Sequence, residues 1–127
     1  WLNRKPGMHS LNTETGEILW STITDKECKE IDINCDPGIS AAVTAIPGAV
    51  IAGHLDGMIR VYDKVTGNIL WSFNSLGNYE SVSGTPASGG SFSGSGPSVR
   101  NGYMAINSGY GIYNHMPGNA LLLFSID

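Results

Sequence analysis

One ten-residue segment occurs twice in this chain, and this repeat constrains the fold more strongly than any other feature. Residues 12–21 read Asn-Thr-Glu-Thr-Gly-Glu-Ile-Leu-Trp-Ser, and residues 63–72 read Asp-Lys-Val-Thr-Gly-Asn-Ile-Leu-Trp-Ser, 51 positions later. A further copy begins at residues 125–127, which align with residues 61–63 at an offset of 64 positions. Repeats of about 40–50 residues are typical of solenoids and β-propellers.

Short apolar runs separated by turn residues decide between these two architectures. The runs are Ile39–Ala45, Ala49–Ala52, Met58–Tyr62 and Ile69–Phe73, and the turns are Pro47-Gly48, Asp56-Gly57 and Thr66-Gly67. Asp-Gly between apolar runs is a strong hairpin signal, because the turn needs the positive φ that glycine adopts without strain. Four such strands in about 50 residues make one antiparallel blade. We therefore predict an all-β fold, a partial β-propeller of four-stranded antiparallel blades.

The length fits only part of a propeller. The chain has 127 residues, enough for about two and a half blades, whereas closed propellers have 4–8 blades. We expect residues 1–127 to be a fragment of one propeller domain, with repeats near 8–58 and 59–124. Because the sequence starts and stops within a repeat, two sheet edges would be open. We expect the remaining blades, from the same parent chain or from other chains, to cover them.

Charge and hydropathy exclude other classes of protein. The formal net charge is −4 with only 7 Lys and Arg residues, which argues against the clustered basic surface that binds nucleic-acid phosphates. Every apolar run is far shorter than the ~20 residues of a membrane-spanning helix. A hydrophobic content of 41% argues against a disordered acidic chain. We expect a folded domain without a nucleic-acid partner or a membrane span.

The repeated motif reads as structural. Asn12 or Asp63, three residues before Thr-Gly, can accept hydrogen bonds from the backbone of the turn, and the glycine takes the positive-φ position. The glycines are Gly16 and Gly67, and the indoles that follow are Trp20 and Trp71. A large flat side chain repeated once per blade suits packing between blades, with its N–H bonded to the next sheet. We expect both indoles to be buried at equivalent positions.

A segment rich in glycine and serine interrupts the second repeat. Residues 81–96 read Ser-Val-Ser-Gly-Thr-Pro-Ala-Ser-Gly-Gly-Ser-Phe-Ser-Gly-Ser-Gly, and strand-like sequence resumes at Pro97 and Tyr103. Such a segment in isolation reads as a flexible linker. Because it lies between strands of one repeat, we expect a long loop on one face of a blade, where binding sites are common.

The repeat resembles the tryptophan-docking repeat of pyrroloquinoline-quinone (PQQ) propellers. The residues that carry the resemblance are Gly53, Asp56, Gly57, Ile59, Val61, Asp63, Thr66, Gly67 and Trp71. The final third, residues 89–97, 101–111 and 116–124, resembles the C-terminal part of polyvinyl-alcohol-dehydrogenase-like quinoproteins. The resemblance implies that the chain forms the C-terminal blades of a periplasmic or extracellular alcohol dehydrogenase that holds PQQ with calcium, with a cytochrome c as a possible electron acceptor.

The resemblance leaves two function classes open. The same repeat occurs in non-catalytic propellers, so the alternative is a PQQ-like propeller that serves as a protein-binding scaffold. The sequence has no Cys-x-x-Cys-His segment for covalent haem. No trio of Asp, Glu or Asn residues stands out as a calcium site. We therefore expect metal ligands and the catalytic base to lie on other blades, and the fragment alone to be inactive.

Two cysteines flank a short charged connector. Cys28 and Cys35 are seven positions apart, and a disulfide between them would restrain this loop and fit an oxidising compartment. The alternatives are two reduced thiols or, less well supported, a metal-binding pair.

Candidate cofactor contacts follow from strand order within a blade. We expect the innermost strand to come first, at residues 40–43 and 97–100, so the residues that lead into these strands lie nearest the propeller axis. This places Ser40, Gly90 and Ser91 near a ligand, with Ser108 and Tyr110 as further candidates. Glycine lets the backbone approach a flat ligand, serine binds carboxylates and tyrosine offers a flat face. The alternative is a glycine- and serine-rich loop that only covers an apolar edge.

Other polar residues read as ordinary surface groups. His54 falls in a hairpin turn and needs no function there. Arg60 and Lys64 fit the solvated face of an outer strand. His115 lies in a loop rich in glycine and asparagine, where it is either a rim residue over a ligand or a solvated histidine. We expect Gly90→Val to leave the fold intact.

Overall fold

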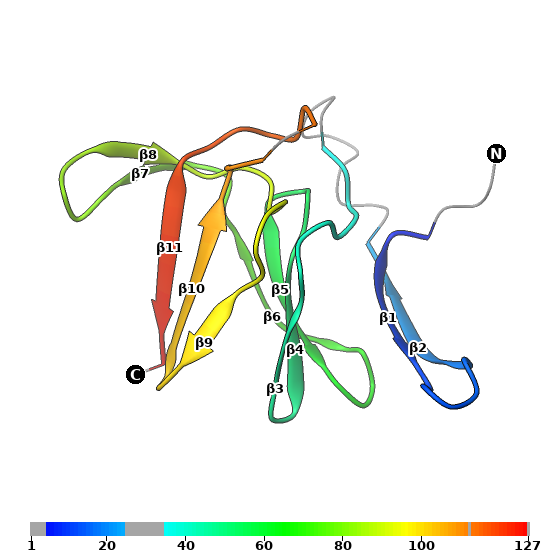
Figure 1. Ribbon diagram of the computed structural model, residues 1–127. Helices are drawn as coiled ribbons and strands as arrows, with labels where there is room; N and C mark the ends of the chain where they lie inside the picture. Colours follow the sequence, from blue (N-terminus) through cyan, green and yellow to red (C-terminus); the bar gives the residue numbers. More distant parts are fainter. Residues whose placement is uncertain (1–4, 25–34, 112, 127) are drawn as a thin grey trace.

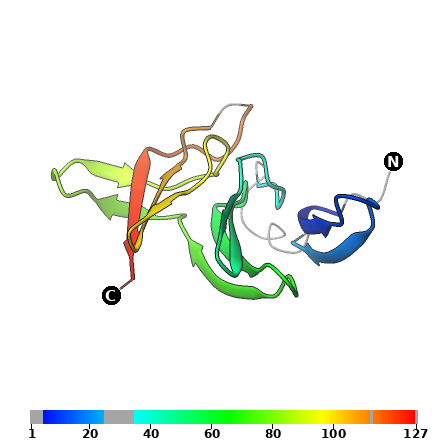
Figure 2. The same cartoon turned by 60° about the horizontal axis from the view of Figure 1, so that its bottom comes forward.

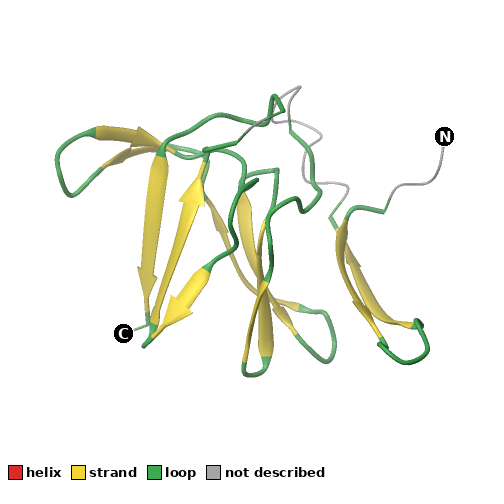
Figure 3. Cartoon of the chain, viewed as in Figure 1, coloured by secondary structure: helices red, strands yellow, loops and turns green. Residues whose placement is uncertain are grey.

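The computed structural model describes residues 5–24, 35–111 and 113–126. These residues form eleven β-strands and no helix (Figures 1 and 3). The described residues therefore contain no helix that could cross a membrane. The predicted all-β fold is confirmed.

The strands form three sheets that follow one another along the chain and one short side hairpin. The N-terminal sheet consists of β1 (Gly7–Leu11) and β2 (Ile18–Ile23), and the central sheet of β3 (Thr44–Ile46), β4 (Ala49–Gly53), β5 (Met58–Asp63) and β6 (Ile69–Asn74). The side hairpin is β7 (Asn78–Glu80) with β8 (Pro86–Ser88). The C-terminal sheet is β9 (Ser98–Arg100), β10 (Tyr103–Ser108) and β11 (Ala120–Ser125).

The central sheet is a complete four-stranded blade. Its spatial order is β3-β4-β5-β6, every neighbouring pair is antiparallel, and each strand follows the previous one through a tight turn. The N-terminal and C-terminal sheets contribute two and three strands among the described residues. The three sheets stand side by side, as consecutive blades do (Figure 2). The prediction of a partial propeller is confirmed by this arrangement.

Apolar side chains fill the two spaces between the three sheets. Between the central and C-terminal sheets, the buried side chains are Ile51, Ile59, Phe92 and Ile106. Between the N-terminal and central sheets, they are Met8, Ala52 and Tyr62, with Trp20 packed against them. Some side chains of β5 therefore face the C-terminal sheet and others face the N-terminal sheet. This follows from the two-residue period of a strand, in which successive side chains point to opposite faces.

The repeated turns have the same local structure. Asp63 Oδ1 accepts the N–H groups of Val65 and Thr66, both at 2.8 Å. Asn12 Oδ1 likewise accepts two backbone N–H groups of its own turn, at 2.8 and 3.2 Å. Gly16 and Gly67 have φ of 75° and 74°, a region that favours glycine.

The two repeated indoles differ in exposure. Trp20 in β2 packs on Gly67 of the central sheet, and its Nε1–H donates to the carbonyl of Lys64 at 3.0 Å. Trp71 in β6 faces the C-terminal sheet in the same way and contacts Phe124, but it is 41% exposed. Trp20 is itself only partly buried, so the expectation of two buried indoles is wrong for both. Trp71 is the more exposed of the two, because no turn of the described residues covers it as the β5–β6 turn covers Trp20.

Two segments differ from the expected secondary structure. Residues 40–43 lead into β3 and are not themselves a strand. Within the segment rich in glycine and serine, residues 86–88 pair with β7 instead of forming a continuous loop. The turn of this side hairpin is closed by Ser81, whose Oγ accepts the N–H of Thr85 at 3.0 Å. Serine in a turn makes such local bonds readily, which composition alone does not reveal.

Candidate functional site at the loop end of the sheets

Four connecting segments meet at one end of the sheets, the upper end in Figure 1. They are the β4–β5 turn (residues 54–57), the approach to β3 (residues 36–43), the loop before β9 (residues 89–97) and the β10–β11 loop (residues 109–119). We call this region the loop end. Backbone hydrogen bonds join its segments, from Leu55 N–H to the carbonyl of Gly38 at 2.9 Å and from Phe92 N–H to the carbonyl of His54 at 3.0 Å.

Two of the five candidate cofactor residues, Gly90 and Ser108, meet in a buried cluster with Ser75. Ser108 Oγ accepts the N–H of Gly90 at 2.9 Å and lies 3.0 Å from the Gly90 carbonyl. It also lies 2.9 Å from Ser75 Oγ, which in turn donates to the carbonyl of Gly57 at 2.8 Å. Both serines are fully buried. Ser108 therefore fastens the 89–97 loop to the C-terminal sheet.

Ser91 joins the same loop to two others. Its Oγ donates to the carbonyl of Leu55 and accepts the N–H of Met116 at 3.0 Å. Its backbone N–H donates to the carbonyl of Met116 at 2.9 Å. These bonds use the polar groups of a side chain that is 1% exposed. In this arrangement Ser91 positions the loops and does not present its hydroxyl to solvent.

The other two candidates present their side chains to solvent. Ser40 is exposed in the approach to β3. Tyr110 is 60% exposed, and its hydroxyl donates to the carbonyl of Asn119 at 2.8 Å. This bond spans the β10–β11 loop and fixes the direction of the aromatic ring. Of the five candidates, these two are the ones that a ligand at the loop end would reach directly.

The expectation that Gly90→Val would leave the fold intact is wrong. A Cβ at this position would collide with the carbonyl oxygens of Met116 and Pro117. Gly90 is buried between the 89–97 and 109–119 loops. Backbone cannot yield as a flexible side chain does, so the substitution would separate the two loops.

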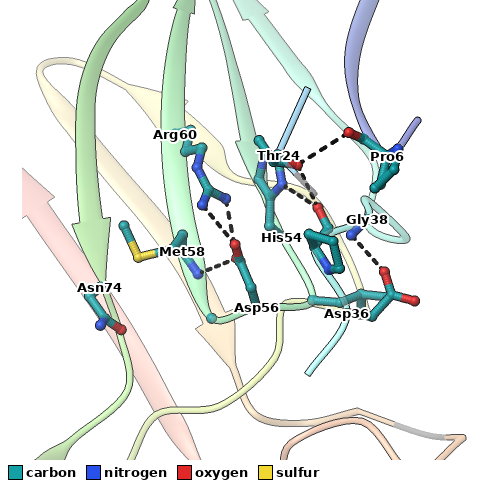
Figure 4. A network of polar contacts seen from close by, with 12 residues as sticks. Pro6, Thr24, Asp36, Gly38, His54, Asp56, Met58, Arg60 and Asn74 are labelled. Atoms are coloured by element: carbon teal, nitrogen blue, oxygen red, sulfur yellow. Dashed lines mark hydrogen bonds and ion pairs between the residues drawn. The ribbon is translucent and has the colours of Figure 1, made fainter. Parts of the chain in front are cut away.

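A buried ion pair between Asp56 of the β4–β5 turn and Arg60 of β5 supports this turn (Figure 4). Arg60 Nη2 lies 2.7 Å from Asp56 Oδ2, Arg60 Nη1 donates to Oδ1 at 3.2 Å, and Met58 N–H donates to the same Oδ1 at 3.0 Å. Asp56 is 0% and Arg60 2% exposed. The expectation of a solvated Arg60 is wrong, because this face of β5 is covered by neighbouring structure. The alternation of polar and apolar residues along β5 does not reveal that both faces of this strand are buried.

His54 lies in the same region and is also fully buried. Its Nδ1 lies 3.2 Å from the carbonyl of Pro37 and its Nε2 lies 2.8 Å from the hydroxyl of Tyr62. A carbonyl only accepts, so Nδ1 carries the proton and Nε2 accepts from Tyr62. Burial, and to a smaller extent the nearby Arg60 charge, lower the pKa of His54 from 6.5 to about 4. The imidazole is therefore neutral at pH 7.

Hydrogen bonds also tie the N-terminal sheet to the loop end. Thr24 Oγ1 donates to the carbonyl of Pro37 at 2.8 Å, and Thr24 N–H donates to the carbonyl of Pro6 at 2.9 Å. Asp36 Oδ1 accepts the N–H of Gly38 at 2.7 Å (Figure 4). The approach to β3 is thus restrained by a bond to Thr24 and by a bond within the segment itself.

Two buried polar atoms at the loop end have no hydrogen-bond partner among the described residues. They are Ser93 Oγ and His115 Nδ1, and both are shielded from solvent. A Cβ on Gly111 would lie 2.5 Å from the first and 3.7 Å from the second, so both atoms lie beside this glycine. The sequence singled out His115 as a candidate rim residue, whereas nothing in it pointed to Ser93.

The described residues contain no metal site, and the predicted disulfide involves a residue outside them. Across residues 5–24, 35–111 and 113–126, no three His, Cys, Asp or Glu side chains lie together as metal ligands would. Cys28 lies outside the described residues, so the Cys28–Cys35 bridge stays a prediction.

Comparison with known proteins identifies relatives over nearly the whole chain. No protein-family model matches the sequence. It is 36% identical over 133 aligned positions to a polyvinylalcohol dehydrogenase from Pseudomonas sp., which covers 97% of this chain and 21% of the relative. It is 33% identical over 135 positions to a polyvinylalcohol dehydrogenase from Sphingopyxis sp. (strain 113P3), with the same coverage. The chain is therefore similar to two polyvinylalcohol dehydrogenases and spans about a fifth of their length.

Proposed function

We propose that residues 1–127 form consecutive blades of a PQQ-dependent alcohol dehydrogenase. The observation that carries this proposal is the similarity to two polyvinylalcohol dehydrogenases over 97% of the chain. The resemblance of the repeats to PQQ propellers and the blade architecture support it. The complete protein would oxidise an alcohol in the periplasm or outside the cell and pass electrons to an acceptor such as a cytochrome c.

Within this enzyme, the described residues contribute the wall of the cofactor site. When bound, PQQ supplies a quinone that is reduced to the quinol as an alcohol is oxidised to a carbonyl compound. Ser40 and Tyr110 are exposed at the loop end and are the residues that contact the cofactor, Ser40 through its hydroxyl and Tyr110 through its ring. Gly90, Ser91 and Ser108 hold the loops that carry these contacts.

No three His, Cys, Asp or Glu side chains lie together among the described residues as metal ligands would. We assign the proposed calcium site and the catalytic base to other blades of the complete protein. The loop-end residues would bind and orient the cofactor.

Addition of PQQ and Ca²⁺ to the complete protein, followed by dye-linked oxidation of polyvinyl alcohol and of a small secondary alcohol, tests the proposal. We expect dye reduction that requires PQQ, the metal and an alcohol. Tyr110→Ala should weaken PQQ retention by about fivefold, since one aromatic contact is worth about 1 kcal/mol, whereas Val65→Ala at the opposite end should not. A complete protein that folds but does not retain PQQ would instead be the non-catalytic scaffold.

A further inference from the structure

Two loops of the loop end each carry a polar atom whose bonding capacity is unused. Ser93 Oγ of the 89–97 loop and His115 Nδ1 of the β10–β11 loop are shielded from solvent and make no hydrogen bond to any described residue. Shielded polar groups are nearly always paired in folded proteins, because an unpaired one loses its bonds to water without replacement. Two such groups on facing loops therefore point to a binding partner that the described residues do not supply.

Both atoms lie beside Gly111, and both can be turned toward a ligand. A Cβ on Gly111 would lie 2.5 Å from Ser93 Oγ and 3.7 Å from His115 Nδ1. The Ser93 and His115 side chains are only partly buried. Rotation about their side-chain bonds can therefore turn the two atoms toward the open side of the loop end without movement of the backbone.

The backbone before His115 has an unusual conformation. Tyr113 and Asn114 have φ of 61° and 59°, a left-handed region that a bulky residue such as tyrosine rarely adopts. The Tyr113 ring meets the His115 imidazole edge-on, with the ring centroids 6.4 Å apart. Strained backbone of this kind is found where the position of a side chain matters for function. The strain thus favours a binding role for the residue that follows it.

The chemistry of the two groups suits a carboxylate. A serine hydroxyl donates one hydrogen bond, and Nδ1 donates another in one of the two tautomers of a neutral imidazole. Two neighbouring donors match the two oxygens of a carboxylate. Residues 89–97 and 109–119 contain no lysine or arginine, so a carboxylate bound by these loops depends on neutral donors. PQQ carries carboxylate groups around a flat ring system, whereas a simple alcohol substrate carries none.

On the basis of the proposed function, we propose that Ser93 and His115 together bind one carboxylate group of PQQ. Ser93 Oγ donates to one carboxylate oxygen and His115 Nδ1 donates to the other. The two side chains then serve the cofactor and not the fold. Their removal should therefore weaken PQQ binding and leave the unfolding temperature unchanged, a combination that a structural role would not give.

Equilibrium dialysis of PQQ against the complete protein in the presence of Ca²⁺ tests the proposal without a measurement of activity. Ser93→Ala and His115→Leu should each weaken PQQ binding by about tenfold, the usual effect of one hydrogen bond to a charged group. His115→Asn places an amide N–H close to the position of Nδ1 and should restore most of the affinity. Ser95→Ala is the matched control, because Ser95 is an exposed serine of the same loop, and it should bind PQQ normally.

The trimethyl ester of PQQ tests the carboxylate itself. The unsubstituted protein should bind the ester at least about tenfold more weakly than PQQ, and this preference should be clearly smaller in the double variant Ser93→Ala with His115→Leu. An equal preference in both proteins, or normal PQQ binding by both single variants, would overturn the inference and leave an ordered water as the partner of the two atoms. Weakened binding accompanied by a lower unfolding temperature would overturn it in favour of a structural role. A complete protein that folds but binds no PQQ would refute the proposed function and this inference with it.

Discussion

The indole of Trp20 lies on Gly67 of the following sheet, and its N–H is bonded to the carbonyl of Lys64 at 3.0 Å. A Cβ at Gly67 would overlap the indole ring. The tryptophan of one repeat thus provides the flat side chain. The glycine of the next repeat provides the space into which that indole fits. This relationship explains why the repeat retains both a tryptophan and a glycine.

Gly67→Ala should destabilise the protein more than Gly16→Ala. Both glycines have φ near 75°, so both substitutions carry the same left-handed strain of about 1 kcal/mol. Only the alanine at position 67 also displaces an indole, because nothing lies within 4 Å of a Cβ at position 16. Overpacking adds about 1–3 kcal/mol. Urea unfolding of the two variants measures the difference, and equal losses would show that Trp20 does not depend on this contact.

The buried pair of Asp56 and Arg60 should depend strongly on both partners. Removal of one partner from a buried ion pair costs about 3–5 kcal/mol, because the remaining charge stays desolvated. We expect Asp56→Leu to lose this amount and the double variant Asp56→Leu with Arg60→Met to lose clearly less. A double-mutant cycle followed by urea unfolding measures the coupling. Additive losses would contradict the direct pairing of these two side chains.

Stability should fall in mildly acidic solution because of His54. Its pKa is lowered to about 4 in the folded protein, against 6.5 when unfolded, so the unfolded state binds the proton more tightly. The stabilisation is complete above pH 6.5 and is lost as the pH falls toward 4, by up to about 3 kcal/mol. Protonation would also place a donor on Nε2, which accepts from Tyr62. Unfolding free energies at pH 7 and pH 4.5 should differ less in His54→Gln, and an unchanged difference would exclude His54 as the cause.

Two serines of the loop end should respond in opposite ways to removal of the hydroxyl. Ser108→Ala leaves the buried N–H of Gly90 without its acceptor, which costs about 1–3 kcal/mol. Ser93→Ala removes a hydroxyl that is shielded and has no partner, so it should be neutral or stabilising. Thermal unfolding of both variants tests this contrast. A marked loss in Ser93→Ala would reveal a bond that the structure does not contain.

The sequence predicted the elements that depend on local chemistry. The 51-residue repeat, the Asp-Gly turn and the Thr-Gly turns predicted the strands and their order, because turn geometry is decided by a few neighbouring residues. The candidate residues Gly90, Ser91 and Ser108 lie in one region, where their polar groups bond to the loops themselves, and their role toward a cofactor stays a prediction. What no local pattern predicts is contact between distant segments. Arg60 reads as a surface residue until the neighbouring sheet covers it, and nothing local in the sequence indicates that Ser75 meets Ser108.

Position-resolved hydrogen exchange of the complete protein, with and without PQQ, tests the central claim most directly. If the loop end holds the cofactor, peptides that cover residues 36–43, 89–97 and 109–119 should exchange more slowly once PQQ is bound. Peptides from the turns at the opposite end, around residues 47–48, 64–68 and 101–102, should be unchanged. Protection confined to those opposite turns, or no protection anywhere in residues 1–127 when PQQ is bound, would contradict the claim.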